Sequence, residues 1–181
     1  MKNLFLLLPL LLPVTAGAVE FSKVQPELSS VAFVSKQMGV PVEGVFKKFS
    51  AHIKMNPAKP ETGVAHIEID LASIDAGSAE ANDEVKGKSW FSVAEFPKAS
   101  FVSSGVKALG GGKYEATGKM TIKGKTVEMR APYTIKDDKG MLNIEGVLPL
   151  KRLDFGIGSG LWSDTSVVAD EVQIKFHFVL K

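Results

Sequence analysis

The sequence predicts an all-β protein, an antiparallel β-barrel of about eight strands with a short helical insertion. Two observations lead to this fold class. Apolar and polar residues alternate with a period of two in one segment after another, and short turns join most of these segments. A sheet with one apolar face must fold onto itself or onto a second layer. About eight strands suffice for a barrel that holds one small ligand, and a β-sandwich is the main alternative.

The N-terminal half is expected to contain three strands, in residues 30–38, 42–55 and 65–71. Each of them alternates apolar with polar positions, as half-buried strands do. Gly44 and the pair Lys47–Lys48 interrupt the second segment, which predicts a bend or a bulge there.

The segment from Ser78 to Lys86 predicts the helical insertion. It lacks the alternation of the strands and contains several residues that favour helices. Ser78 is a suitable N-cap, and Gly87 is a stop signal. We therefore expect a helix of about two to three turns at this point of the chain.

The C-terminal half predicts five more strands, in residues 99–109, 113–122, 127–135, 141–150 and 172–180. Between the second and third of these, Gly118 to Thr126 resembles a phosphate-binding loop. The spacing between its glycines is one residue too long and no helix follows, so Lys123–Lys125 is expected at the tip of a β-hairpin. Residues 152–160 are rich in glycine and predict a sharp, irregular turn.

Residues 1–18 have the features of a secretory signal peptide. Lys2 precedes an apolar run that is too short to span a bilayer, and a small-x-small cleavage pattern ends at Ala18. We expect residues 19–181 to form one domain in the periplasm. The chain has no Cys, so its stability must come from a core rather than from disulfides. The formal net charge of +2, with both signs interspersed, gives no footprint for nucleic acid.

The polar residues predict no catalytic residue, no metal site and no cofactor. His52, His66 and His177 all fall on outward positions of their strands, whereas a metal site needs convergent ligands. Asp154-Phe155-Gly156 matches the metal-binding triplet of protein kinases, yet no other kinase motif is present. The sequence therefore favours a protein that is not an enzyme.

Large apolar residues occupy many inward positions. Most are expected to form an ordinary core, but Phe rings and Met thioethers also suit a cavity for a flexible apolar chain. The alternation of residues leaves open whether the barrel is filled or hollow. The candidates for a cavity lining are Phe33, Phe46, Phe49, Ile53, Ile67, Ile69, Trp90, Phe91, Phe101, Met120, Met129, Tyr133, Phe155, Trp162 and Phe176.

A series of motifs runs in order through residues 19–181. They are Ser30-Val31-Ala32-Phe33, Val42-Glu43-Gly44-Val45-Phe46, Ile67-Glu68-Ile69, Ala72-Ser73-Ile74-Asp75, Asn82-Asp83, Trp90-Phe91, Phe96-Pro97-x-Ala99-x-Phe101-x-Ser103, Gly118-x-x-Thr121-Ile122-x-Gly124, Arg152-x-Asp154-Phe155-Gly156 and Asp170-Glu171-Val172. Together they resemble the YceI-like family of secreted bacterial proteins. Ser29, Met38 and Val85 depart from the family pattern, which often has histidines at or near these positions.

This resemblance implies a lipocalin-like barrel that binds a polyisoprenoid, an isoprenoid quinone or a similar long-chain lipid without catalysing a reaction. Asn82, Asp83 and Arg152 flank the helix and the glycine-rich segment, which makes them candidates for the cavity mouth. The expected partner is the lipid, with transient contact to a membrane, and a homodimer is one option for the oligomeric state. Two alternatives stay open: a packed stress-response or interaction module without lipid, and an enzyme acting on a lipid or quinone.

Overall fold

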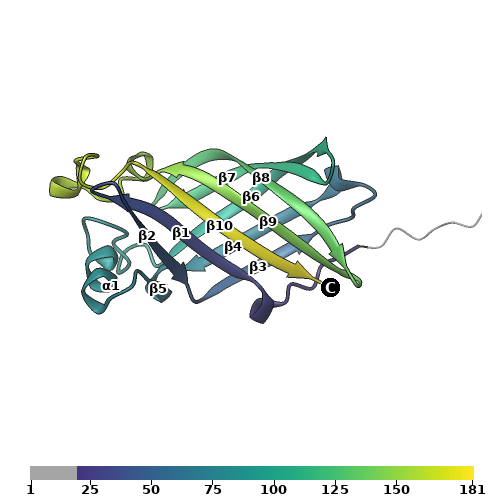
Figure 1. The fold of residues 1–181 in the computed structure, drawn as a ribbon, viewed down its shortest axis with the longest axis horizontal. Helices are drawn as coiled ribbons and strands as arrows, with labels where there is room; N and C mark the ends of the chain where they lie inside the picture. Colours follow the sequence, from purple (N-terminus) through teal and green to yellow (C-terminus); the bar gives the residue numbers. More distant parts are fainter. Residues whose placement is uncertain (1–19) are drawn as a thin grey trace, which may run out of the picture.

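The computed structural model describes residues 20–181, and the expected signal peptide, residues 1–18, lies outside the described residues. Within residues 20–181, one antiparallel sheet of ten strands curls strongly, with helix α1 (Ala79–Lys86) at one end (Figure 1). The strands are β1 (Ser30–Gln37), β2 (Val40–Phe46), β3 (Phe49–Lys54), β4 (Val64–Asp70), β5 (Ile74–Asp75), β6 (Lys98–Gly110), β7 (Lys113–Ile122), β8 (Lys125–Asp138), β9 (Met141–Lys151) and β10 (Glu171–Leu180). Their order across the sheet is β3-β4-β6-β7-β8-β9-β10-β1-β2-β5.

The all-β fold class and the helical insertion are confirmed, but the prediction of about eight strands is wrong. The segment predicted as one strand, residues 42–55, divides at Lys47–Lys48 into β2 and β3, and Ile74–Asp75 adds β5 beside β2. Over residues 20–181 the hydrogen-bonded ladder runs from β3 to β5 without joining these two strands. The sheet is therefore a strongly curled half-barrel rather than a fully hydrogen-bonded barrel or a two-sheet sandwich.

The N-terminal segment spans the sheet at the end opposite α1. Phe21 exchanges two backbone hydrogen bonds of 2.9 Å with Met55, just beyond β3. Lys23 pairs with Lys181 through bonds of 3.1 and 2.9 Å, just beyond β10. These backbone bonds hold the two strand ends together although the strands themselves do not pair.

Helix α1 begins and ends where the sequence predicts. The Ser78 hydroxyl accepts a hydrogen bond of 3.1 Å from a first-turn amide, and Gly87 follows the last helical residue. The β7–β8 hairpin reaches the same end of the molecule, where Lys123 Nζ donates to the carbonyls of Lys88 (2.8 Å) and Gly156 (3.0 Å). We call this end, where β5 and α1 also lie, the α1 end (Figure 1).

Short 3₁₀ helices complete the chain. They are η1 (Pro26–Leu28), η2 (Pro60–Thr62), η3 (Leu71–Ser73), η4 (Arg152–Phe155) and η5 (Gly160–Ser163). The last two occupy the glycine-rich segment, as Figure 1 shows at the yellow-green end of the sheet. Gly156, Gly158 and Gly160 all have a positive φ there, so this irregular path depends on residues that adopt the left-handed region.

Three phenylalanine rings lie against glycines of neighbouring strands. A Cβ added to any of these glycines would collide with the ring, and also with a backbone carbonyl that cannot easily move. The pairs are Phe33 with Gly44, Phe101 with Gly118, and Phe176 with Gly146. The missing side chains therefore let the rings lie close to the sheet wall rather than fill the interior.

Arg152 organises the glycine-rich segment. Its side chain is 1% exposed and donates only to backbone carbonyl oxygens. The acceptors are those of Ala169 (3.0 Å), Ile157 (2.8 Å), Gly158 (3.0 Å), Trp162 (2.7 Å) and Val168 (2.7 Å). Burial lowers the pKa of the guanidinium, and the Asp170 carboxylate opposes that change. One charge thus holds η4, η5 and the approach to β10 in a single arrangement.

The variant Gly146→Ala is expected to lower the free energy of unfolding by about 2 kcal/mol, because the methyl group overpacks the Phe176 ring and the Pro132 carbonyl. Gly105→Ala is the matched control, since the space beside that strand glycine is open. Guanidinium denaturation of both variants gives the comparison. Equal stabilities for the two variants would contradict the proposed contact.

Arg152→Lys is expected to cost about 3 kcal/mol of stability, because a lysine keeps the charge but cannot serve five carbonyls arranged around a guanidinium. Arg130→Lys, an exposed position on β8, makes the same chemical change and should shift stability by less than about 0.5 kcal/mol. Denaturation curves measure both values. A small effect at both positions would show that the carbonyl cluster does not depend on Arg152.

Candidate functional site

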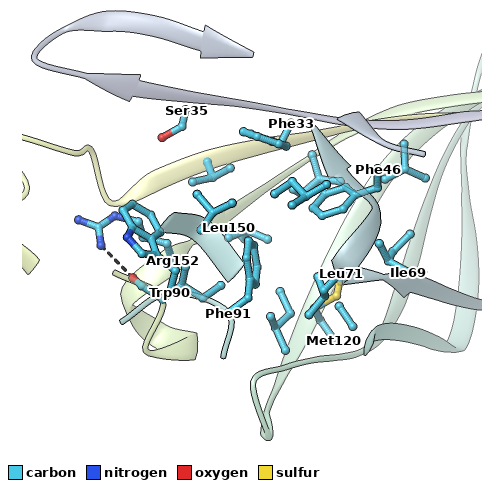
Figure 2. Close-up of a pocket in the computed structure, with 18 residues that line it drawn as sticks. Phe33, Ser35, Phe46, Ile69, Leu71, Trp90, Phe91, Met120, Leu150 and Arg152 are labelled. Carbon is cyan, nitrogen blue, oxygen red and sulfur yellow. Dashed lines mark hydrogen bonds between the residues drawn. The ribbon is translucent and has the colours of Figure 1, made fainter. Parts of the chain in front are cut away.

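A cavity of about 130 Å³ lies inside the curled sheet near the α1 end (Figure 2). Strands from both halves of the chain contribute to it, together with α1 and the segment that follows it. All but two of its lining residues, Ser35 and Arg152, are hydrophobic or aromatic. The lining consists of Val31, Phe33, Ser35, Phe46, Ile69, Leu71, Ile74, Val85, Trp90, Phe91, Ala99, Met120, Ile122, Leu150, Arg152, Ile157, Val172 and Ile174.

Two smaller cavities continue along the interior. One of about 80 Å³ shares Val31, Ile69 and Ala99 with the cavity of about 130 Å³. We call the latter the largest cavity because it is the largest of these three interior spaces; two wider pockets, of about 310 and 380 Å³, are more open to solvent. The next, of about 60 Å³, shares Phe101 and Phe176 with the second. Because each cavity has wall residues in common with its neighbour, the three form a row from the α1 end toward the opposite end of the sheet. We call this row the apolar tunnel.

The interior is thus neither solidly filled nor an open barrel. Cavities of about 150 Å³ with purely aliphatic and aromatic walls stay dry and bind molecules the size of benzene. The largest cavity here is close to that size. Each space matches a short hydrocarbon unit, and only side chains separate one space from the next.

The charged groups near the tunnel are already engaged. Figure 2 shows the Arg152 guanidinium directed away from Phe91, toward the carbonyls that it binds. The indole N–H of Trp90 donates to Glu84 at 3.2 Å. In the smallest cavity, burial raises the pKa of the Tyr133 phenol well above its ordinary value, so that group stays neutral. Among the described residues, Ser35 is the one with a hydroxyl group that lines the largest cavity.

Most of the residues proposed as a lining surround the tunnel. Phe33, Phe46, Ile69, Trp90, Phe91 and Met120 line the largest cavity, and Ile53, Ile67, Phe101, Tyr133 and Phe176 line the smaller two. The other four lie outside these walls. Phe49 packs edge-on against Phe178 at 5.9 Å, and Met129 packs against the core. Phe155 is a core residue with 1% exposure, and Trp162 packs against Trp90.

The three residues proposed for the cavity mouth have separate roles. Asn82 accepts a hydrogen bond of 2.6 Å from the Ala76 amide and so holds the start of the helical insertion. Asp83 is exposed, away from the three cavities. Arg152 lines the largest cavity, but all its N–H groups donate to backbone carbonyls. Of the three, only Arg152 lines one of the cavities.

Eleven of the eighteen residues that line the largest cavity were not proposed from the sequence, among them Ala99, and Glu84, which lies outside the cavity walls, was assigned no role at the site. Ala99 lines the first and second cavities, and its small side chain contributes to their space. Ala99 lies two residues before Phe101 on the same strand, so the alternation of the strand already placed its side chain on the inward face. Glu84 accepts hydrogen bonds from both tryptophan side chains of the chain. No sequence pattern connects it with Trp162, 78 residues away.

The polar surface offers little other chemistry. His52 and His66 are exposed cross-strand partners on β3 and β4. His177 lies near Asn143 (3.1 Å) and Glu145 (3.8 Å). In residues 20–181 no group of three or more His, Cys, Asp or Glu could hold a metal ion. No helix in the same range has the length and apolar character of a membrane span.

Solved structures resemble this fold over nearly all of its length. The crystal structure of Burkholderia cenocepacia BcnA is 51% identical, with a TM-score of 0.86, and the match covers 88% of this chain and 100% of that one. A polyisoprenoid binding domain from Saccharophagus degradans, implicated in plant cell wall breakdown, has a TM-score of 0.67 over 90% and 97% of the two chains. At 14% identity, that second likeness is one of fold alone.

Sequence comparison identifies the family. A UPF0312 protein of Azotobacter vinelandii is 32% identical over 124 residues, which span 65% of either chain. A UPF0312 protein of Pseudomonas savastanoi is 32% identical over 147 residues, 77% of this chain and 74% of that one. The family model described as YceI-like domain matches residues 23–180, nearly the whole of the described structure. The chain therefore belongs to the YceI-like domain family.

Proposed function

We propose that this protein is a non-catalytic carrier that holds the apolar chain of a polyisoprenoid or a similar lipid in its tunnel. The row of three apolar cavities inside the curled sheet is the observation that carries this proposal. Similarity in fold to a polyisoprenoid binding domain agrees with it. The signal peptide expected in residues 1–18 makes the periplasm the proposed compartment.

The energetics suit carriage between membranes. A prenyl unit has about five carbons, and at ~0.8 kcal/mol per CH₂ its burial from water gains about 4 kcal/mol. A lipid chain in a bilayer is already in hydrocarbon, so its transfer into an apolar tunnel is close to neutral. The protein need only match the bilayer and shield the chain from water while it crosses.

The tunnel accommodates a chain in short units. The largest cavity takes about one prenyl unit by comparison with benzene-sized cavities. A longer chain must therefore displace the side chains that separate the three spaces. Met120 lies on the wall between the first and second cavities, and its flexible thioether can change rotamer at low cost.

The polar groups favour a lipid whose head carries no charge within the cavity. Arg152 has no free donor for a phosphate, and Lys123 donates to two carbonyls. The other polar side chain on the wall of the largest cavity is that of Ser35, an uncharged hydroxyl. A buried phosphate would stay unpaired there, and an unpaired buried charge is costly.

Lipid extracted from natively purified protein and identified by mass spectrometry tests the carrier proposal. Ala99→Leu, which adds bulk where the first two cavities meet, should reduce the bound lipid about tenfold, or ~1.4 kcal/mol in affinity. Val102→Leu is the control, because Val102 is on the same strand and its side chain, 46% exposed, lies on the outer face of the sheet. Folded wild-type protein that carries no lipid and takes up none from vesicles would overturn the proposal in favour of a packed interaction module.

The head-group preference can be tested with two ligands of equal chain length. Farnesol is expected to bind at least as tightly as farnesyl phosphate, because no free cation compensates the phosphate at the cavity wall. Titration calorimetry at neutral pH measures both affinities. Phosphate binding that is about tenfold tighter, a difference of ~1.4 kcal/mol, would show that a cationic group serves the head after all.

A further inference from the structure

Two tryptophans stand between the largest cavity and the solvent at the α1 end. Trp90 is half-buried and lines the cavity, where Figure 2 shows its indole beside Arg152 and Phe91. Trp162, on η5, packs against Trp90 with ring centroids 5.5 Å apart and rings tilted by 52°. Trp162 is half-buried and lines none of the three cavities. The order from the interior outward is therefore cavity, Trp90, Trp162.

One carboxylate oxygen holds both indoles. Glu84 Oε1 accepts from Trp90 Nε1 at 3.2 Å and from Trp162 Nε1 at 2.7 Å. Glu84 belongs to α1, Trp90 to the segment after it, and Trp162 to η5. Three parts of the chain thus meet at a single exposed atom. Because these hydrogen bonds are open to solvent, water can replace them when the indoles separate.

Little packing holds the outer part of this arrangement. Leu161, next to Trp162, is 94% exposed, so the tip of η5 buries no large aliphatic side chain. Gly158 and Gly160, with φ of +74° and +66°, precede it. The Ser89 carbonyl accepts hydrogen bonds from the Gly158 and Ser159 amides at 2.9 and 2.8 Å, and Arg152 binds the Trp162 carbonyl. The backbone of this segment is therefore held, and the side chains are the parts that can rotate.

The opposite end of the tunnel is closed more firmly. Backbone hydrogen bonds join Phe21 to Met55 and Lys23 to Lys181. Met55 is 3% exposed and Leu180 is fully buried. Opening that end would break paired backbone groups and expose core residues, whereas the α1 end can open by rotating side chains. The α1 end is thus the less costly route for a chain.

We propose that apolar chains enter and leave the tunnel at the α1 end through a gate formed by Trp90 and Trp162, and that Glu84 is its latch. This inference rests on the proposed carrier function and adds the route that the ligand takes. Glu84 is a positioning residue here, since it acts through the two indoles rather than on the ligand. Loss of the latch should speed both association and dissociation while it leaves the affinity unchanged.

Intrinsic fluorescence reports on this gate without a label. The sequence has two tryptophans, and both belong to the gate. Farnesol binding can therefore be followed by stopped-flow measurement of their emission. Glu84→Ala should raise the association and dissociation rates about tenfold, the factor for ~1.4 kcal/mol, with a Kd close to that of the wild type. Glu84→Gln keeps an acceptor oxygen and should give a smaller increase.

Two further variants separate the latch from helix charge and from misfolding. Glu80→Ala removes a carboxylate one turn earlier on α1, away from the indoles, and should exchange farnesol at the wild-type rate. Trp162→Phe removes one N–H donor but keeps an aromatic ring, and it should exchange faster, with Trp90 as reporter. Circular dichroism and denaturation midpoints confirm that each variant is folded.

The possible results distinguish the gate from the carrier function itself. Wild-type protein that binds no farnesol would overturn the carrier proposal and the gate with it. Wild-type protein that binds farnesol while folded Glu84→Ala and Trp162→Phe exchange it at wild-type rates would overturn the gate alone. Faster exchange in both variants, with unchanged Kd and an unaffected Glu80→Ala, is the result expected of a latch.

Discussion

The packing of phenylalanine rings against glycines of neighbouring strands decides how much space this sheet encloses. A strongly curled sheet brings its inward side chains together, and large aromatic residues would normally fill the space between them. Phe33, Phe101 and Phe176 instead lie where a glycine leaves the neighbouring strand without a side chain. The rings stay near the wall, and apolar spaces remain along the axis. The tunnel, and every functional proposal built on it, depends on this arrangement.

The charged residues near the tunnel stabilise the fold. Arg152 would be a natural partner for an anionic head group, yet five backbone carbonyls take all of its donors. Burying this charge is tolerable only because each N–H is satisfied. These hydrogen bonds also hold the backbone of the irregular segment around η5, which carries Trp162 of the tryptophan pair. The same residue thus stabilises the α1 end and leaves the cavity without free charge.

The two ends of the tunnel are closed by different kinds of interaction. Backbone pairing and deeply buried residues close the end near the N-terminal segment, and such structure opens only with local unfolding. At the α1 end, closure relies on an indole pair and two solvent-exposed hydrogen bonds to Glu84. A carrier needs this asymmetry, because a chain must be shielded in water and still be released at a membrane. Small cavities with an adaptable wall are compatible with that task.

The sequence by itself determined the strand pattern, the position and both caps of α1, and the family, because alternation and capping are local properties that one segment carries alone. It also indicated eleven of the residues that line the tunnel, nine of them on strands, where inward phase follows from a period of two. Only the tertiary structure decided that Lys47–Lys48 divides one predicted strand into two, that the rings of Phe33 and Phe176 rest on glycines, and that backbone carbonyls take the donors of Arg152. These outcomes depend on which distant segments meet, such as Glu84 with Trp162. A contact between residues so far apart follows from the curl of the whole sheet, which no local pattern encodes.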